Sequence, residues 1–153
     1  MNPKLIAPCG MNCAICLGYL REKNKCPGCR EMSENKPFYC RKCIIANCEI
    51  LKKNKWKYCS DKCEKFPCKR LKSLDKRYRT KYGMSMIENL KNIKKLGIRQ
   101  FVKNEKVRWT CKNCGSIICV HRDVCQKCGE KRWIKEKYSF KMQKHIILKV
   151  YLF

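Results

Sequence analysis

The spacing of the cysteines is the feature that most limits how this chain can fold. Sixteen of its 153 residues are cysteine, and most of them stand in pairs separated by two or three residues. A short chain with this cysteine content is usually stabilised by disulfides or by metal ions. Two thiolates so close in sequence suit one metal ion, whereas disulfides rarely join such near neighbours. The spacing therefore favours a metal-stabilised protein.

The two ends of the chain also favour metal ligands over disulfides, because they indicate a compartment in which thiols stay reduced. The segment from Met1 to Cys9 contains no apolar stretch of the kind that a secretory signal needs. The longest apolar stretch lies at the C-terminus and is too short to cross a bilayer as a helix. We therefore expect a cytoplasmic protein without a transmembrane segment, in a compartment where thiols stay reduced.

The clearest local motif lies between residues 109 and 130. It consists of two C-x2-C-G knuckles separated by ten residues, with the cysteines Cys111, Cys114, Cys125 and Cys128. A glycine after the second cysteine permits the tight turn that brings two thiolates to one ion. Two such knuckles predict a tetrahedral zinc site of the zinc-ribbon type. Trp109 and Trp133 flank the knuckles, and we expect them to cover a small core.

Cys119 and His121 lie between the two knuckles and are not needed as ligands. In one interpretation they are a buried packing thiol and a surface imidazole. In the other, the imidazole activates the thiol as a nucleophile. The second interpretation lacks an orienting carboxylate, since Asp123 is the only acidic residue close to them in sequence.

The first 68 residues hold the other eleven cysteines, and we expect all of them to be metal ligands. These are Cys9, Cys13, Cys16, Cys26, Cys29, Cys40, Cys43, Cys48, Cys59, Cys63 and Cys68. Cys13 and Cys16 pair naturally with Cys26 and Cys29 in a four-thiolate site. Spacing leaves the grouping of the remaining seven open. In total, we expect three or four zinc ions, with the ligation free energy supplying much of the stability of this polar region.

An iron–sulfur cluster is the alternative cofactor for the N-terminal cysteines. Cys9, Cys13 and Cys16 match the C-x3-C-x2-C spacing of radical enzymes. The chain has neither the length nor the strand–helix alternation for the barrel of such an enzyme. A cluster without radical chemistry remains open because thiolates bind iron as well as zinc.

Composition divides the chain into four segments. Residues 1–68 form a cysteine-rich metal-binding module, 69–108 a helical segment, 109–130 a zinc ribbon and 131–153 a basic and apolar tail. The predicted fold class is therefore a small metal-stabilised α+β protein, with an irregular zinc module, a short helical segment and a C-terminal ribbon. The tail is rich in β-branched and aromatic residues and predicts a strand or a docking segment.

The helical segment contains three predicted helices. The first has Pro67 in its first turn, together with Cys68, whose thiolate the helix dipole would stabilise. It ends at Gly83 and carries one apolar stripe of Leu71, Leu74, Tyr78 and Tyr82. Ser85 and Glu88 form a capping-box pattern for the second helix, which ends at Gly97. A third, shorter helix follows from Ile98.

The chain is strongly basic, with a formal net charge of +26 and Lys outnumbering Arg 28 to 10. Sixteen thiolates on four divalent ions would lower this charge by eight, to about +18. A field of this sign favours anionic partners. A biased genome composition would explain the same excess of lysine without any role in binding.

The cysteine motifs resemble those of the cysteine-rich domain-of-unknown-function 3795 family. The similarity covers about residues 7–75 and includes Cys26-Pro27-Gly28-Cys29-Arg30, together with the cysteines from Cys9 to Cys68 described above. Some members also carry a C-terminal ribbon similar to residues 109–129. The resemblance implies a zinc-binding protein and implies no reaction.

These features predict a binding module for nucleic acid or an acidic protein partner, in which structural zinc supports a basic surface. Trp109, Trp133 and Tyr138 would stack on bases. An iron–sulfur or redox carrier is the alternative. We do not expect an enzyme or a small-molecule substrate, because His121 and His145 are the only imidazoles and carboxylates are few.

Overall fold

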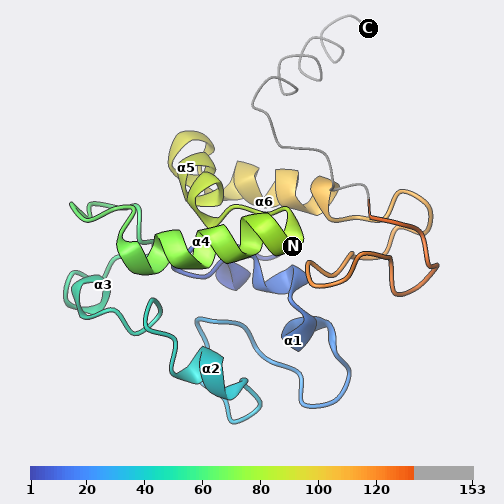
Figure 1. Cartoon of the computed structure of the whole chain (residues 1–153), viewed down its shortest axis with the longest axis horizontal. Coiled ribbons are helices and arrows are strands. Elements are labelled where there is room, and N and C mark those ends of the chain that lie inside the picture. Colours follow the sequence, from blue (N-terminus) through green and yellow to red (C-terminus); the bar gives the residue numbers. More distant parts are fainter. Residues whose placement is uncertain (133–153) are drawn as a thin grey trace, which may run out of the picture.

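The computed structural model describes residues 1–132, and three long helices dominate this part of the chain (Figure 1). These are α4 (Lys69–Tyr82), α5 (Met86–Leu96) and α6 (Ile98–Arg108), all within the segment predicted to be helical. The third helix, predicted to be shorter, has 11 residues, fewer than the 14 of α4 but as many as α5. Gly97 separates the two with a φ of 78°, which allows the chain to turn without a linker.

The ends of α4 and α5 follow from their capping residues. Gly83 adopts a left-handed conformation, with φ 63° and ψ 29°, and ends α4. Ser85 begins α5, and its hydroxyl accepts a hydrogen bond of 3.1 Å from the Glu88 amide, as the capping box predicts. Pro67 was expected in the first turn of α4 but precedes it, since Cys68 is the N-cap residue.

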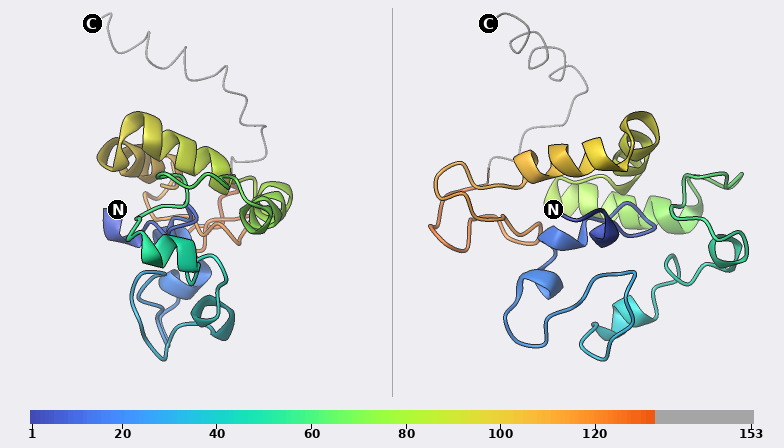
Figure 2. Two further views of the ribbon diagram at one scale, coloured as in Figure 1. Left: turned by 90° about the vertical axis from the view of Figure 1, so that its left-hand side faces the viewer. Right: turned by 180° about the vertical axis from the view of Figure 1, so that it is seen from behind.

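The first 68 residues consist mostly of turns and short helices. The helices are η1 (Pro3–Leu5), η2 (Cys13–Ile15), α1 (Leu17–Leu20), α2 (Phe38–Arg41) and α3 (Glu49–Lys53). Figure 2 shows the N-terminal segment between the three long helices and the cysteine-rich loops. The two knuckles lie at the end of the molecule opposite α3 (Figure 1).

The predicted α+β class is not confirmed for residues 1–132. The β structure of this part is limited to three isolated antiparallel bridges, Ile6 with Asn12, Thr110 with Ile117 and Val124 with Lys131. Two of these bridges, Thr110 with Ile117 and Val124 with Lys131, flank the knuckles. The strand expected in the tail falls on residues 133–153 and lies outside the described residues, as does the tail itself apart from Lys131 and Arg132.

Within residues 1–132, one hydrophobic core joins the N-terminal module, the helical segment and the ribbon. Its fully buried members include Ile6 and Ile15 from the N-terminal segment, Leu90 from α5 and Trp109 from the ribbon. The Leu71 end of the stripe on α4 is buried as predicted. Trp109 therefore covers a core as expected, while Trp133 lies outside the described residues.

Two buried carboxylates fasten the helices to their neighbours. Asp75 on α4 accepts hydrogen bonds from the Ser85 hydroxyl at 2.6 Å and the Ile87 amide at 3.0 Å, and thereby joins α4 to the start of α5. Glu105 on α6 accepts a hydrogen bond from the Asn12 side chain at 3.2 Å. These partners compensate much of the cost of burying a carboxylate. Sequence periodicity did not indicate either role.

Within the part of the chain that the structure describes, none of the helices combines the length and apolar character needed to cross a membrane.

Candidate metal centre

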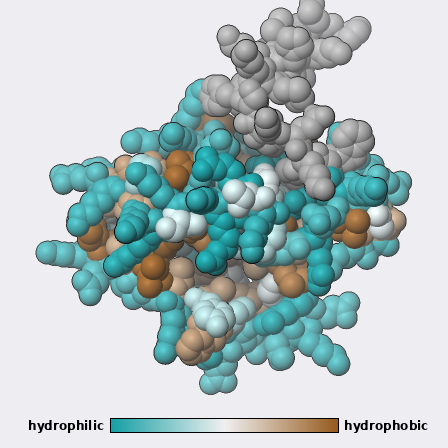
Figure 3. Space-filling view, viewed as in Figure 1, coloured by the Kyte–Doolittle hydropathy of each residue, from teal (hydrophilic) through white to brown (hydrophobic). Residues whose placement is uncertain are grey.

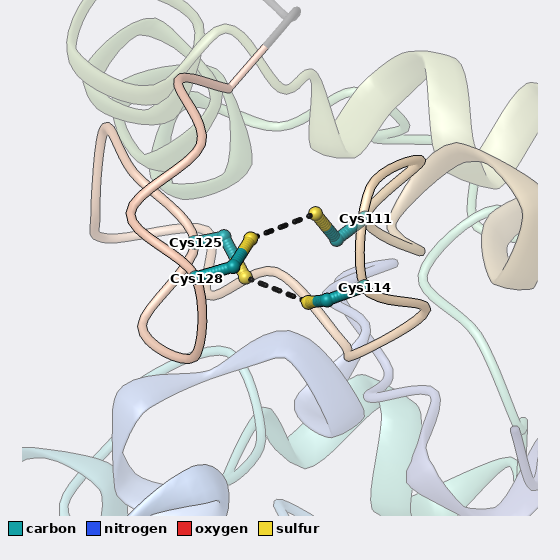
Figure 4. A group of neighbouring side chains, drawn as sticks. All are labelled: Cys111, Cys114, Cys125 and Cys128. Carbon is teal, nitrogen blue, oxygen red and sulfur yellow. Dashed lines mark hydrogen bonds between the residues drawn. The ribbon is translucent and has the colours of Figure 1, made fainter.

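The four ribbon cysteines converge on one point, as their spacing predicts. Their sulfur atoms all lie within 4.8 Å of one another. Cys111 faces Cys128 at 3.7 Å, and Cys114 faces Cys125 at 3.6 Å, so each knuckle contributes one thiol to each close pair (Figure 4). Four sulfurs bound to one tetrahedral zinc at about 2.3 Å would be separated by similar distances. The arrangement can therefore hold a metal ion with little movement.

The two knuckles have the same backbone construction. In the first, the Cys111 amide donates to the Ser116 carbonyl at 2.8 Å and the Gly115 amide donates to the Cys111 carbonyl at 2.9 Å. In the second, Cys125, Glu130 and Gly129 take the equivalent positions at the same two distances. Gly115 and Gly129 have φ angles of 72° and 75°, which explains why both positions are glycine. The repeated construction follows directly from the repeated C-x2-C-G motif.

Ser116 contributes a contact that the sequence motif does not reveal. Its hydroxyl lies 3.0 Å from the Cys114 sulfur and 3.1 Å from the Cys125 sulfur. The hydrogen bond with Ser116 is the main reason why the pKa of Cys125 falls to about 6. A hydroxyl so placed favours the thiolate form, which is the form that binds metal. No spacing rule would have identified this residue.

Cys119 is a packing residue. Its side chain is fully buried, and it is not a member of the four-thiol group. Burial raises the pKa of the Cys119 thiol, which is the opposite of what nucleophilic activation requires. The structure therefore favours the packing interpretation for this cysteine.

His121 is not the surface imidazole that was expected. It is partly buried, and its Nδ1 accepts a hydrogen bond of 3.3 Å from the Leu17 amide at the start of α1. Its Nε2 lies 3.1 Å from the Tyr78 hydroxyl on α4, and its ring packs edge-on against Tyr78 and Tyr82. Because Nδ1 accepts a hydrogen bond, the proton of the neutral ring belongs on Nε2. His121 thus joins the ribbon to α1 and α4.

Replacing His121 with Phe is expected to lower the free energy of unfolding by about 1–3 kcal/mol, since two partly buried hydrogen bonds are lost. Burial, with smaller effects of Arg132 and Arg122, lowers the pKa of His121 from 6.5. This link therefore contributes fully above pH 6.5 and is lost as the pH falls below that value. Urea unfolding at several pH values would show a smaller stability loss between pH 7 and 5.5 in the variant. An equal loss in both proteins would contradict this assignment.

The eleven N-terminal cysteines do not converge on one point as the four ribbon cysteines do. Among residues 1–132, the ribbon thiols form the one group of three or more candidate ligands that meets the 4.8 Å condition. In the predicted site of Cys13, Cys16, Cys26 and Cys29, two of the cysteines are in direct contact. The Cys29 amide donates a hydrogen bond to the Cys13 sulfur at 3.3 Å. Metal ligation by the N-terminal cysteines remains a prediction.

Electrostatic effects nevertheless show which N-terminal thiols are neighbours. The pKa of Cys16 is raised to about 11, mainly by burial and also by the neighbouring thiols of Cys40 and Cys29. Burial also raises the pKa of Cys40, with contributions from Cys29 and Cys26. A divalent cation would reverse these effects, since it stabilises the thiolate that burial and like charges disfavour. Cys40 is therefore a neighbour of the predicted four-cysteine site that spacing had not suggested.

Two basic side chains hold these loops together. Arg30 donates to the carbonyls of Ile6 and Lys57, both at 2.7 Å, and so links the loop after Cys29 to two other segments. The Lys36 amine is buried and donates to the carbonyls of Cys29 and Glu31 at 2.8 and 2.7 Å. The conformation of the cysteine loops is thus fixed by side-chain hydrogen bonds as well as by their own backbone turns.

Comparison with models of known protein families, with curated proteins and with solved structures finds no match. The class of protein is therefore defined by its own features: a small, cysteine-rich helical protein with a four-cysteine group that could bind a metal ion.

Proposed function

We propose that this protein is a zinc-binding module that uses structural, cysteine-ligated sites to support a basic surface for nucleic acid. The four-thiol group of the ribbon carries the proposal, because two matching knuckles place four sulfurs within 4.8 Å of one another. Zinc is the metal that best fits four thiolates in a closed tetrahedral site. The resemblance to the domain-of-unknown-function 3795 family supports the same assignment through the spacing of the N-terminal cysteines.

The distribution of charge over the long helices supports the nucleic-acid part of the proposal. Residues 69–108 contain fourteen Lys and Arg residues but three acidic residues. Two of those acids, Asp75 and Glu105, are buried and hydrogen-bonded inside the protein, which leaves Glu88 as the exposed one in this segment. Burying the acids leaves an outer surface that is more basic than the composition of the helices indicates, and such a surface attracts phosphate groups.

The basic residues of α4 are all exposed. They are Lys69, Arg70, Lys72, Lys76, Arg77, Arg79 and Lys81. Figure 3 shows that hydrophilic side chains cover much of the face on which α4 lies. Arg79 is paired with Asp75 at 3.7 Å, while the lysines extend along the outside of the helix.

The surface does not offer all the aromatic residues that were predicted to stack on bases. Trp109 is fully buried in the core and cannot contact a base. Trp133 and Tyr138 lie outside the described residues. The proposed mode of binding is therefore contact with the phosphate backbone, which confers little sequence preference.

Replacing Lys69, Lys72 and Lys76 together with Ala is expected to weaken binding to single-stranded RNA. Each phosphate contact contributes about 0.7 to the slope of log K against log salt, so the slope should fall by about two. Fluorescence anisotropy with a labelled oligonucleotide over a salt series would measure this change.

The matched control replaces Lys23, Lys53 and Lys127, which are exposed and scattered over other segments, with Ala. It changes the net charge equally and should retain most of the slope. Equal losses in the two variants would mean that no defined surface binds the RNA. Binding of an acidic polypeptide but not of RNA or DNA, even at low salt, would replace nucleic acid with an acidic protein as the partner.

A further inference from the structure

A small cavity lies where α3 meets the beginning of α4, and four cysteines line it. The cavity has a volume of about 40 Å³, and its cysteines are Cys48, Cys59, Cys63 and Cys68. Figure 1 shows α3 and the first turn of α4 at the end of the molecule opposite the ribbon. One water requires about 10–15 Å³, so the space is large enough for an ion.

We propose that Cys48, Cys59, Cys63 and Cys68 form a second metal site, which binds one zinc ion in this cavity. The inference deepens the proposed function, on which it rests for the choice of metal. It selects four ligands from the seven N-terminal cysteines whose grouping the spacing had left open. The other residues that line the cavity are mostly apolar, as expected for a structural site.

The backbone leaves the two outer thiols free to turn toward the cavity. Cys48 is the N-cap residue of α3 and Cys68 is the N-cap residue of α4, and neither side chain makes a capping hydrogen bond. An N-cap serine or aspartate would normally use its side chain to satisfy the first amides of the helix. The thiols occupy these positions without that role.

The four sulfurs surround the cavity but do not yet meet on one point, since among residues 1–132 only the ribbon thiols satisfy the 4.8 Å condition. Zinc ligation therefore requires these four sulfurs to come closer together than they lie in this structure. A divalent cation placed among the four sulfurs would favour the thiolate form that ligation needs.

The remaining lining explains what such a site would do for the fold. It is mostly apolar, with Ile45 and Leu71 among the core residues and with Trp56 and Phe66 beside them. A dry apolar surround excludes water from the metal and is typical of a closed structural site. Four thiolates and one divalent ion carry a net charge of about −2. Arg70 also lines the cavity and supplies a nearby positive charge.

The test uses the full-length protein, prepared anaerobically and loaded with zinc. Alkylation of each cysteine by iodoacetamide is followed by mass spectrometry, before and after a chelator removes the metal. All four cavity cysteines should become alkylated at least about tenfold faster once zinc is removed, because ligation blocks the thiolate. Cys128 serves as the internal reference for the ribbon, since it is exposed and only ligation would protect it.

Protection of Cys128 with no protection of Cys59 and Cys63 would overturn the second site and leave the ribbon intact. No protection at either place would instead contradict the proposed zinc function. Protection that persists after chelation but disappears with a phosphine reductant would identify a disulfide and would also overturn the proposal.

A double variant provides a second measurement. Replacing Cys59 and Cys63 with Ser should lower the zinc content by about one ion per chain, while Cys128 remains protected by zinc. An unchanged zinc content would overturn the proposal. If the double variant does not fold, the alkylation rates of the wild-type protein decide the question.

Discussion

Removing the proposed metal ion from the knuckles is expected to unfold residues 109–132 and to expose Trp109. Ligation free energies of structural zinc sites are about 10–16 kcal/mol in small peptides, more than the whole stability of a typical domain. Trp109 belongs to both the ribbon and the central core, and its side chain is fully buried. A chelator titration followed by circular dichroism and hydrogen exchange would show loss of protection in the knuckles first and then at the core end of α6.

The same effect can be produced by one substitution. Changing Cys125 to Ser removes one ligand and the thiol on which Ser116 acts, and should abolish zinc binding by the ribbon. Changing the neighbouring Cys119 to Ser is the matched control, because this cysteine is buried but does not belong to the four-thiol group. The control should keep the zinc content of the wild type. A folded ribbon in the absence of metal would refute the structural role.

Elemental analysis of the same preparations distinguishes the two metals considered from the sequence. Zinc together with negligible iron and sulfide is expected, because the closed ribbon site offers four thiolates in knuckles typical of zinc. Iron and acid-labile sulfide in stoichiometric amounts, with visible absorption, would favour the iron–sulfur alternative.

Replacing Gly10 with Ala is expected to destabilise the protein by about 2–5 kcal/mol, the sum of backbone strain and overpacking. Gly10 has a φ of 86°, and an added Cβ would lie 2.7 Å from the Met86 carbonyl and 2.9 Å from the Leu90 side chain. The Gly10 carbonyl also accepts a 2.9 Å hydrogen bond from the buried Asn89 side chain. The N-terminal segment would therefore have to separate from α5.

Gly97 offers a control with a similar backbone but open space. Its φ is 78°, and an added Cβ would meet nothing within 4 Å. Its replacement with Ala should cost about 1–3 kcal/mol from strain alone. Urea unfolding of the two zinc-loaded variants would measure the difference, which is expected to be at least about 1 kcal/mol. Equal costs would mean that Gly10 is needed only for its φ angle and not for close packing.

The sequence by itself determined the features that are local. The C-x2-C-G repeats specified the two knuckles, because each requires only two thiols and a glycine within five residues. Ser85, Gly83 and Gly97 marked the helix ends for the same reason, since capping depends on nearest neighbours along the chain. The three long helices of residues 69–108 followed from these signals and from apolar periodicity.

Only the tertiary structure decided the relationships between distant segments. His121 meets Leu17 across 104 positions and Asn12 meets Glu105 across 93, and no spacing rule reports such pairs. The burial of Asp75 and Glu105, which leaves the outer surface of the helices so basic, depends on partners supplied by other segments. The placement of Cys48, Cys59, Cys63 and Cys68 around one cavity also depends on tertiary packing. Sequence spacing limits which thiols can share an ion, but the packing of loops against α3 and α4 places four of them around one cavity.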